Sequence, residues 1–488
     1  MPYPGADPST AAAAAARLSR RRMVRRAVPP PPPAATSGGR GDRTLWVPGT
    51  EHFAARPDLD PYLVLMEPDH PAFVDLGRLL WTLVATQWSW IDRRVENVSL
   101  SGERSFRRHM SIDCRVPPAV VDLAEELGFT RFFVPLRFVT KQPLLAFDLR
   151  LGERSVPLLT RRQNTMACQA VLRAALEDAD LPINADVVTA IEHVCSDERP
   201  GAEHTLRLLE LTEAGRPGVD ATPLELAHWA VTTLDTNYLL LADVGLGELR
   251  RRNIFKVTQE VGPTMRGMQE LPLRSGIAWQ PTSFVFETPS VTATSSYHFQ
   301  FEAPDGLVVA GGGLFGRVDG VPERLTFGTT AVQGSVLGLH AAADDVPPAD
   351  DYHAEVLVRP SPDGLLRSSA VSACFSTVLL VLAALLADRI EQTEVDASTA
   401  LLLVLPGVVS TFLARPGEHY WVSRLLRGVR VLTLISAVTV YLAAATLVTG
   451  VAPGGSLRAL WAVFAVISAV PSVALVVASR RGGLYGWS

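Results

Sequence analysis

Two pairs of histidine and glutamate lie in segments where apolar and polar residues alternate: His298 with Glu302, and His353 with Glu355. Such alternation predicts half-buried strands whose polar residues share the solvent face. If the two strands were neighbours, the four side chains would form a metal-binding or acid–base cluster. The favoured alternative is an ordinary solvated sheet face, which this alternation produces without any function. The catalytic residues therefore stay unknown, and no metal and no cofactor is expected.

Two basic clusters contain the residue types that bind phosphate. Arg107 and Arg108 stand beside His109, and Arg161–Arg162 lie near the expected start of a helix. Arginine can hold a phosphate or a lipid headgroup through paired hydrogen bonds, but surface arginines more often form ion pairs with nearby carboxylates. The triglycine at 311–313 lacks the lysine and the following helix of a phosphate-binding loop, so a turn is expected there. The sequence contains no P-loop, H-E-x-x-H, G-x-S-x-G, Rossmann or kinase signature.

The composition points to a membrane. Hydrophobic residues make up 48% of the 488 residues and charged residues 19%, which excludes a wholly disordered chain. The four cysteines form no C-x-x-C pair, so neither a zinc ribbon nor a disulfide framework is indicated. Four uncharged apolar runs follow one another at 368–387, 397–414, 431–450 and 459–479. Because a membrane-spanning helix needs about 20 residues, these runs predict a four-helix transmembrane bundle.

The charges of the connecting segments orient these helices. Residues 388–396 carry four acids and one arginine, whereas residues 415–430 carry four arginines and one glutamate. Basic loops stay cytoplasmic, so both ends of the chain and the large N-terminal region are expected on the inner side of the cell membrane. Residues 1–45 contain no apolar core of a secretory signal, which agrees with this orientation. The candidates for contact with inner-leaflet headgroups are then Arg415, His419, Arg424, Arg427 and Arg430.

Three regions precede the bundle. Residues 1–45 form an arm rich in arginine and proline that is expected to be disordered and either drawn to the anionic inner leaflet or simply solvated. Residues 46–250 are expected to form a mixed, mainly helical domain, and residues 251–367 a β-rich, sandwich-like domain. The predicted fold class is thus mixed: an α+β cytoplasmic region that ends in an antiparallel β-rich domain and continues into a four-helix transmembrane bundle.

Several elements follow from local signals. The run 73–91 is too often interrupted by charge to span a membrane and is expected to be a buried or interfacial helix. Thr160 and Gln163 have the spacing of a capping box, which predicts a helix to about Asp178. Residues 132–151 are expected to form two strands, and three further helices are expected at 185–195, 203–213 and 223–242.

The four apolar runs contain no ionisable residue, which argues against a pump or a coupled transporter. We therefore expect a polytopic membrane-anchored protein whose cytoplasmic domain is a protein-interaction, regulatory or assembly module. The alternatives are a ligand-sensing, channel-like protein and an inner-leaflet enzyme that acts on a lipid or a small molecule, although enzymatic activity is not favoured. The expected partners are membrane lipid, an unidentified protein and, as a candidate, a second copy of the chain; nucleic acid is not expected.

Two resemblances concern layout. A β-rich domain followed by four spans resembles the order of parts in pentameric ligand-gated channels, but that family keeps its β-domain outside, opposite to the orientation expected here. The architecture, the abundance of alanine and arginine, and the presence of only two lysines, Lys141 and Lys256, resemble uncharacterised integral membrane proteins of actinobacteria. This second resemblance rests on layout and composition and carries no functional residue over.

Overall fold

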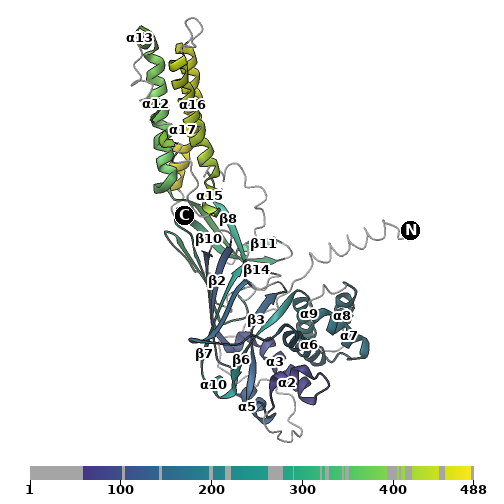
Figure 1. The fold of residues 1–488 in the computed structure, drawn as a ribbon. Coiled ribbons are helices and arrows are strands. Elements are labelled where there is room, and N and C mark those ends of the chain that lie inside the picture. The colour runs from purple at the N-terminus through teal and green to yellow at the C-terminus, as the bar shows by residue number, and fades with distance from the viewer. Residues whose placement is uncertain are drawn as a thin grey trace, which may run out of the picture.

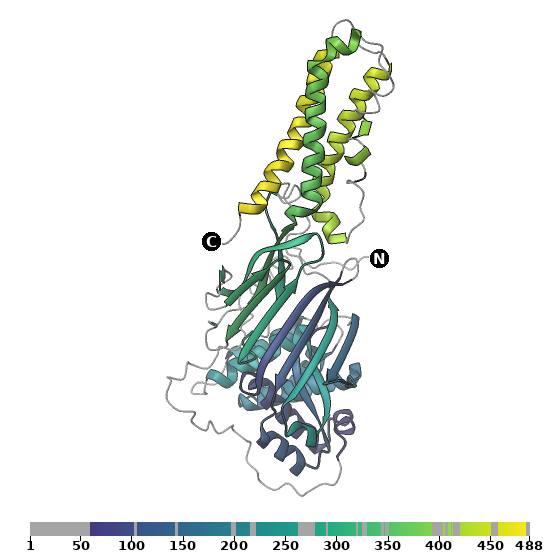
Figure 2. The same cartoon turned by 90° about the vertical axis from the view of Figure 1, so that its left-hand side faces the viewer.

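The computed structural model describes residues 59–101, 105–141, 145–196, 202–214, 221–261, 279–288, 291–318, 321–324, 329–342, 346, 351–392, 404–405, 408–410, 412, 420–449 and 457–484. The predicted arm at 1–45 lies outside these residues. Within them the chain has a mixed α/β architecture with a β-rich region followed by C-terminal helices. Figures 1 and 2 show a helical layer at one end, β-sheets in the middle and long helices at the other end.

The largest sheet has eight strands and joins segments that are far apart in the sequence. In spatial order they are β12 (Thr329–Gln333), β13 (Val336–Ala342), β9 (Ser296–Glu302), β1 (Ile91–Ser101), β2 (Ser105–Cys114), β7 (Asn253–Val261), β4 (Leu145–Leu151) and β5 (Arg154–Ser155). All neighbouring strands are antiparallel except β1 and β9, which run parallel. Strands from both sides of residue 250 therefore share one sheet.

A second, four-stranded antiparallel sheet packs face to face on the first. Its strands, in spatial order, are β11 (Val321–Arg324), β10 (Leu307–Val318), β14 (Asp351–Pro360) and β8 (Thr282–Glu287). Aromatic side chains fill the space between the sheets, and the rings of Phe106 and Phe284 meet edge to face with centroids 5.8 Å apart. The alternation read from the sequence is observed, because Tyr297, Phe299 and Phe301 are all 1% exposed or less.

The turn expected at the triglycine 311–313 is not formed. These glycines lie inside strand β10. A Cβ atom on Gly312 would lie 2.6 Å from the Glu355 carbonyl oxygen and 2.6 Å from a Leu337 methyl group. Because a side chain there would collide with the neighbouring strand and the facing sheet, glycine allows the two sheets to pack closely. A turn at Pro304–Gly306 precedes this strand, and Leu307 N donates to Pro304 O at 3.1 Å.

The helical layer packs around a small two-stranded sheet (Figure 1). This sheet pairs β3 (Arg131–Thr140) with β6 (Asn237–Gly245) in antiparallel register. The helices are α2 (Pro61–Met66), α3 (Pro71–Ala85), α4 (Gln87–Trp90), α5 (Pro118–Glu126), α6 (Arg161–Asp178), α7 (Ala185–Cys195), α8 (Ala202–Ala214), α9 (Ala221–Thr236) and α10 (Leu246–Leu249). The capping box is formed: Thr160 accepts from Gln163 N, and the Gln163 amide oxygen accepts from Thr160 N at 2.9 Å.

Two sequence interpretations in this layer have clear outcomes. The run 73–91 is the buried helix α3 followed by α4, with Leu76, Leu80 and Leu83 all 0% exposed. The helix expected at 223–242 is too long, because α9 ends at Thr236 and the next residues form β6. The backbone of β6 pairs with β3, and its apolar side chains are buried within the layer, so tertiary pairing overrides local helix propensity there.

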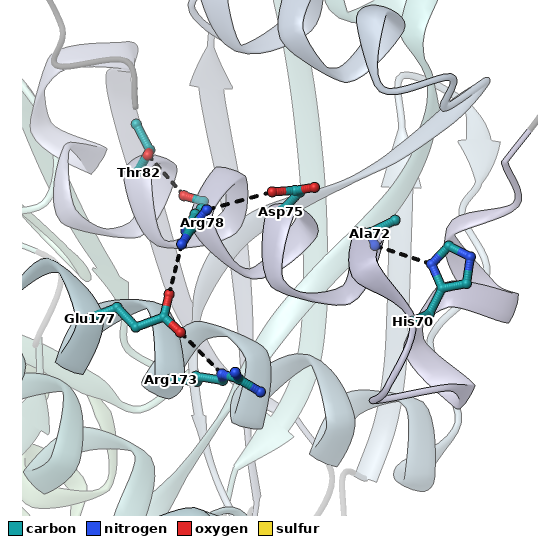
Figure 3. Close-up of polar contacts among 7 residues, drawn as sticks. All are labelled: His70, Ala72, Asp75, Arg78, Thr82, Arg173 and Glu177. Carbon is teal, nitrogen blue, oxygen red and sulfur yellow. Dashed lines mark hydrogen bonds and ion pairs between the residues drawn. The ribbon is translucent and has the colours of Figure 1, made fainter. Parts of the chain in front are cut away.

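Helices α3 and α6 pack closely at a glycine. A Cβ atom on Gly77 would lie 2.5 Å from the carbonyl oxygen of Ala170, so only glycine fits without a shift of one helix. Polar contacts beside this crossing are shown in Figure 3, where Arg78 of α3 lies between Asp75 and Glu177. The Arg78–Glu177 distance is 3.2 Å, and Arg173 also reaches Glu177 at 3.1 Å. These exposed ion pairs add little stability beside the apolar contact.

The C-terminal helices begin directly after β14. A short kinked segment, η2 (Pro362–Leu366), leads into α12 (Arg367–Leu385) and α13 (Ala387–Gln392), and the later helices are α15 (Tyr420–Leu425), α16 (Arg427–Thr449) and α17 (Leu457–Leu484). Among the described residues, three helical stretches are long and apolar enough to cross a membrane: Pro362–Leu385, Arg427–Thr446 and Leu457–Arg480. The prediction of four spans is therefore corrected to three. Most of the predicted span 397–414 lies outside the described residues.

The surface of these helices is apolar, whereas hydroxyl groups lie between them. Phe375 is 53% exposed, Val466 67% and Val470 66%, as expected for side chains that face lipid. Inside, the Thr377 hydroxyl lies 2.7 Å from that of Ser472 and 2.9 Å from that of Ser468. Because hydrogen bonds between small polar residues hold helices together in lipid, this pattern agrees with membrane association.

Candidate functional site

The two predicted histidine–glutamate pairs lie on opposite outer faces of the sandwich. β9 points its aromatic residues into the core, so His298 and Glu302 lie on the outer face of the eight-stranded sheet. β14 likewise places His353 and Glu355 on the outer face of the four-stranded sheet. β9 and β14 belong to different sheets and are not neighbours. The four-residue cluster therefore does not form, because the condition on which it depended is not met.

Each pair has local partners instead. The rings of His298 and His340 have centroids 4.4 Å apart, and the Ser296 hydroxyl lies 3.2 Å from a nitrogen of each ring. On the other face, Glu355 accepts a hydrogen bond of 2.5 Å from the Ser283 hydroxyl, and His353 stacks on a phenylalanine ring. No group of three or more histidine, cysteine, aspartate or glutamate residues suited to a metal ion occurs in the described part of the chain.

The basic residues at 105–109 lie in strand β2, so their side chains point to opposite faces of the sheet. Arg107 lies on the outer face of β2, where its Nη2 atom is 3.5 Å from Glu260 Oε1. Arg108 points the other way and forms an ion pair with Glu96, whose side chain is 0% exposed. The second cluster, Arg161–Arg162, is exposed at the start of α6. Of the four arginines, Arg108 alone is directed into the protein.

Arg108 belongs to a buried ionic cluster, which we call the arginine cluster: Arg94, Glu96, Arg108, Arg137 and Tyr297. The first three come from the β1–β2 hairpin, Arg137 from β3 and Tyr297 from β9. Tyr297 donates from its hydroxyl to Glu96 Oε2 at 2.9 Å. Arg94 donates to the Leu136 carbonyl at 2.8 Å, which brings it beside Arg137. Arg137 in turn reaches the sulfur of Met110, the register partner of Glu96, at 4.0 Å.

The cluster carries more positive than negative charge. Its three arginines face one carboxylate, and Arg94 is 0% and Arg137 8% exposed. Burial lowers the pKa of Arg94 to about 10 and that of Arg137 to about 9, and the neighbouring arginines contribute to both shifts. For Arg108, burial also acts to lower the pKa, but Glu96 outweighs it and the pKa is raised. A buried charge without a partner costs several kcal/mol, so the cluster is energetically expensive for a fold that needs only a core.

The neutral groups of the cluster do not supply the missing negative charge. Burial raises the pKa of Tyr297 well above its usual value, so the phenol stays protonated. Burial also raises the pKa of the Cys114 thiol, which acts electrostatically on Arg94, to about 12. Glu96 therefore carries the one buried carboxyl group among the groups that act most strongly on these arginines. Glu287, which also acts on Arg108, is exposed.

The predicted headgroup-contacting residues lie, as far as they are described, at the base of the helix bundle. Arg424 is in α15 and Arg427 at the start of α16, where its side chain is exposed. Arg430 is 8% exposed and donates to the Ser423 hydroxyl at 2.6 Å, so it faces protein more than solvent. Arg415 and His419 lie outside the described residues.

The base of the bundle and the sandwich share one hydrophobic core. Ala373 of α12, Val422 of α15 and Leu475 of α17 are each 0% exposed and belong to the same cluster as the aromatic residues between the sheets. Trp279 donates from its indole nitrogen to the Ala474 carbonyl of α17 at 3.0 Å. We call this contact region the junction. Figure 2 shows the helices rising directly from the upper ends of the sheets there.

The chain matches no protein-family model and no curated protein.

Sequence reasoning missed most of the arginine cluster. Arg94 and Glu96 stand in a strand in which charged and apolar residues occupy both faces, so its inward face gives no periodic signal. Arg137 follows an almost wholly apolar run, and a lone arginine in a buried strand is the signal that points to an internal partner.

Proposed function

We propose that this protein is a membrane-anchored regulatory and protein-interaction module whose large α/β domain lies in the cytoplasm. The observation that supports it best is the junction, where sandwich and helix bundle form one continuous core. A domain that is merely tethered needs only a linker, whereas a shared core ties the position of each helix to the packing of the sheets. Because cores have discrete packings, such a junction can transmit a change from one part to the other.

The proposed topology places both ends of the bundle on the cytoplasmic side, since Ala370 near the start of α12 and Ala478 near the end of α17 both belong to the shared core. α12 leaves the junction and extends about 28 Å at 1.5 Å per residue. α16 begins again at the junction, where Val429 is part of the shared core. Between these two helices, Ser410 lies 2.8 Å from Ser372 of α12, hydroxyl to hydroxyl, so this residue packs within the bundle.

Charge supports the same orientation. Arg424, Arg427 and Arg430 gather at the junction end, and Arg367 begins α12 there. At the far end, Asp388 lies 3.6 Å from Arg458, so the basic charge is not in excess there. Since basic segments stay on the cytoplasmic side, the junction and the α/β domain are assigned to the inner face.

Cysteine labelling in intact cells tests this topology. Asp186→Cys places an exposed thiol on α7 of the α/β domain, and Asp388→Cys places one at the far end of the bundle; the wild-type carboxylates are 65% and 70% exposed. A membrane-impermeant maleimide is expected to label the far-end thiol in intact cells and the α7 thiol only after lysis. The unmodified chain is the control, because three of its four cysteines are buried. Labelling of Asp186→Cys in intact cells would refute the topology.

Affinity capture of the full chain from its own solubilised membranes tests the interaction role. Quantitative mass spectrometry is expected to recover at least one protein reproducibly with the wild-type chain. The matched control is Val422→Asp. Val422 is 0% exposed, so this substitution puts a charge into the junction core and replaces no exposed residue. If no protein is enriched over an unrelated membrane protein prepared in the same way, the interaction role is refuted.

A further inference from the structure

The arginine cluster has an excess of donors that the protein itself does not use. In the described structure, Arg94 donates from Nη2 to the Leu136 carbonyl, and its Nε atom is buried without a hydrogen-bond partner. Arg137 donates to the neighbouring carbonyl of Phe138 and to a sulfur, which is a weak acceptor. Neither arginine has a carboxylate within ion-pair distance among the described residues, whereas Arg108 has Glu96.

The three arginines lie close enough to act electrostatically on one another, and Arg108 also donates from Nη2 to the Glu287 carbonyl at 2.9 Å. Arg94 and Arg108 lie on adjacent strands of the hairpin, on the same face as Glu96 and Tyr297. Arg137 approaches this face from β3, beside the carbonyl that Arg94 contacts. Planar guanidinium groups gathered in one region match the paired oxygen atoms of a phosphate or a carboxylate. Arg108 is 13% and Arg137 8% exposed, so the cluster is not fully sealed from solvent.

We propose that Arg94, Arg108 and Arg137 form a binding site for a small oxyanion with a phosphate or carboxylate group. Glu96 and Tyr297 have a positioning role, because the ion pair holds Arg108 and the tyrosine hydroxyl holds the glutamate. The bound anion supplies the negative charge that the buried cluster lacks. The site does not depend on the proposed membrane topology.

The location of the site favours an anion from solution over a lipid headgroup. The end of the sandwich near Gly306 meets the bundle, since a Cβ atom at that glycine would lie 3.5 Å from a Val422 methyl group. Tyr297 is six residues before Ala303 along β9, and a strand rises about 3.3 Å per residue. The cluster thus lies about 20 Å from the membrane end of the sheet, beyond the reach of a headgroup in the bilayer.

Thermal unfolding of the full chain in a non-ionic detergent tests the site with inorganic phosphate as the probe. Phosphate is expected to raise the Tm of the wild-type protein in a saturable way, whereas sodium chloride at the same ionic strength is not. Arg137→Met removes one donor and one buried positive charge while keeping a long apolar side chain. This variant is expected to match or exceed the wild-type Tm without phosphate and to bind phosphate at least ten-fold more weakly.

Two controls separate the site from general effects of charge. Arg150→Gln removes an exposed arginine of the same sheet, and its phosphate response is expected to equal that of the wild type. Micelles that contain phosphatidic acid, compared with phosphatidylcholine, are expected to give no shift beyond that of free phosphate. The proposal is overturned if phosphate and chloride shift the wild type equally, if Arg137→Met keeps the full phosphate response, or if only phosphatidic acid stabilises the protein. Equilibrium dialysis with radiolabelled phosphate measures phosphate binding directly and tests the proposal without relying on unfolding.

Discussion

Replacing Gly77 with alanine is expected to destabilise the helical layer, although alanine is the better helix former. The new Cβ atom would lie 2.5 Å from the Ala170 carbonyl oxygen, and an ordinary contact begins at 3.4 Å, so α3 and α6 must separate by about 0.9 Å. Overpacking of this kind costs about 1–3 kcal/mol. The gain in helix propensity is about 1 kcal/mol. The balance is a net loss of about 1 kcal/mol.

Two measurements check this expectation. A net loss of that size lowers the Tm by about 2–4 °C for a domain of 150–250 residues. Hydrogen exchange with mass spectrometry is expected to show faster exchange in peptides from α3 and α6 than in peptides from the sandwich. Gly247→Ala is the matched control: this glycine lies in helix α10, and a Cβ atom there meets nothing within 4 Å. If Gly77→Ala melts at or above the temperature of Gly247→Ala, the close-packing argument is refuted.

Three further predictions follow from contacts described above. Tyr297→Phe removes the donor to Glu96 Oε2 and is expected to cost about 1–3 kcal/mol, seen as a lower Tm; an unchanged Tm would contradict this. Burial, with smaller contributions from His340 and Arg93, lowers the pKa of His298 below 6.5. The unfolded chain therefore binds more protons at this residue, and the stability of the fold decreases as the pH drops below about 6.5. His298→Gln is expected to reduce this pH dependence of the Tm in thermal melts between pH 7 and pH 5. Thr377→Val removes two hydroxyl contacts between α12 and α17 and is expected to lower the free energy of unfolding by about 0.6–1.7 kcal/mol in unfolding titrations in mixed micelles. An unchanged free energy of unfolding would mean that these hydroxyl groups only fill space.

Local signals in the sequence predicted the regular elements well. The capping box at Thr160 fixed the start of α6, and the predicted helix 185–195 coincides with α7. Alternation in β9 and β14 identified the inward residues of both strands. These features depend on residues that are close in sequence, so they can be recognised without knowledge of the fold.

Features that depend on distant pairing could not be predicted in the same way. The end of α9 at Thr236 is set by the pairing of β6 with β3, about 100 residues earlier in the chain. The arginine cluster combines residues from four strands, and the ion pair of Glu96 with Arg108 requires the β1–β2 hairpin register. Arg94 and Arg137 come together only because β3 packs beside that hairpin.

The parallel pairing of β1 with β9 has a consequence for biosynthesis. β2 ends at Cys114 and β9 begins at Ser296, so ribosomes adding about 5–20 residues per second need roughly 10–40 s to supply the missing neighbour. During that interval one edge of the early hairpin has no strand to bond, which exposes it to wrong association. β14, the last strand of the sandwich, is followed by the short segment η2 and then by α12. Completion of the sandwich and delivery of the first apolar helix to the bilayer therefore fall in the same short period of translation.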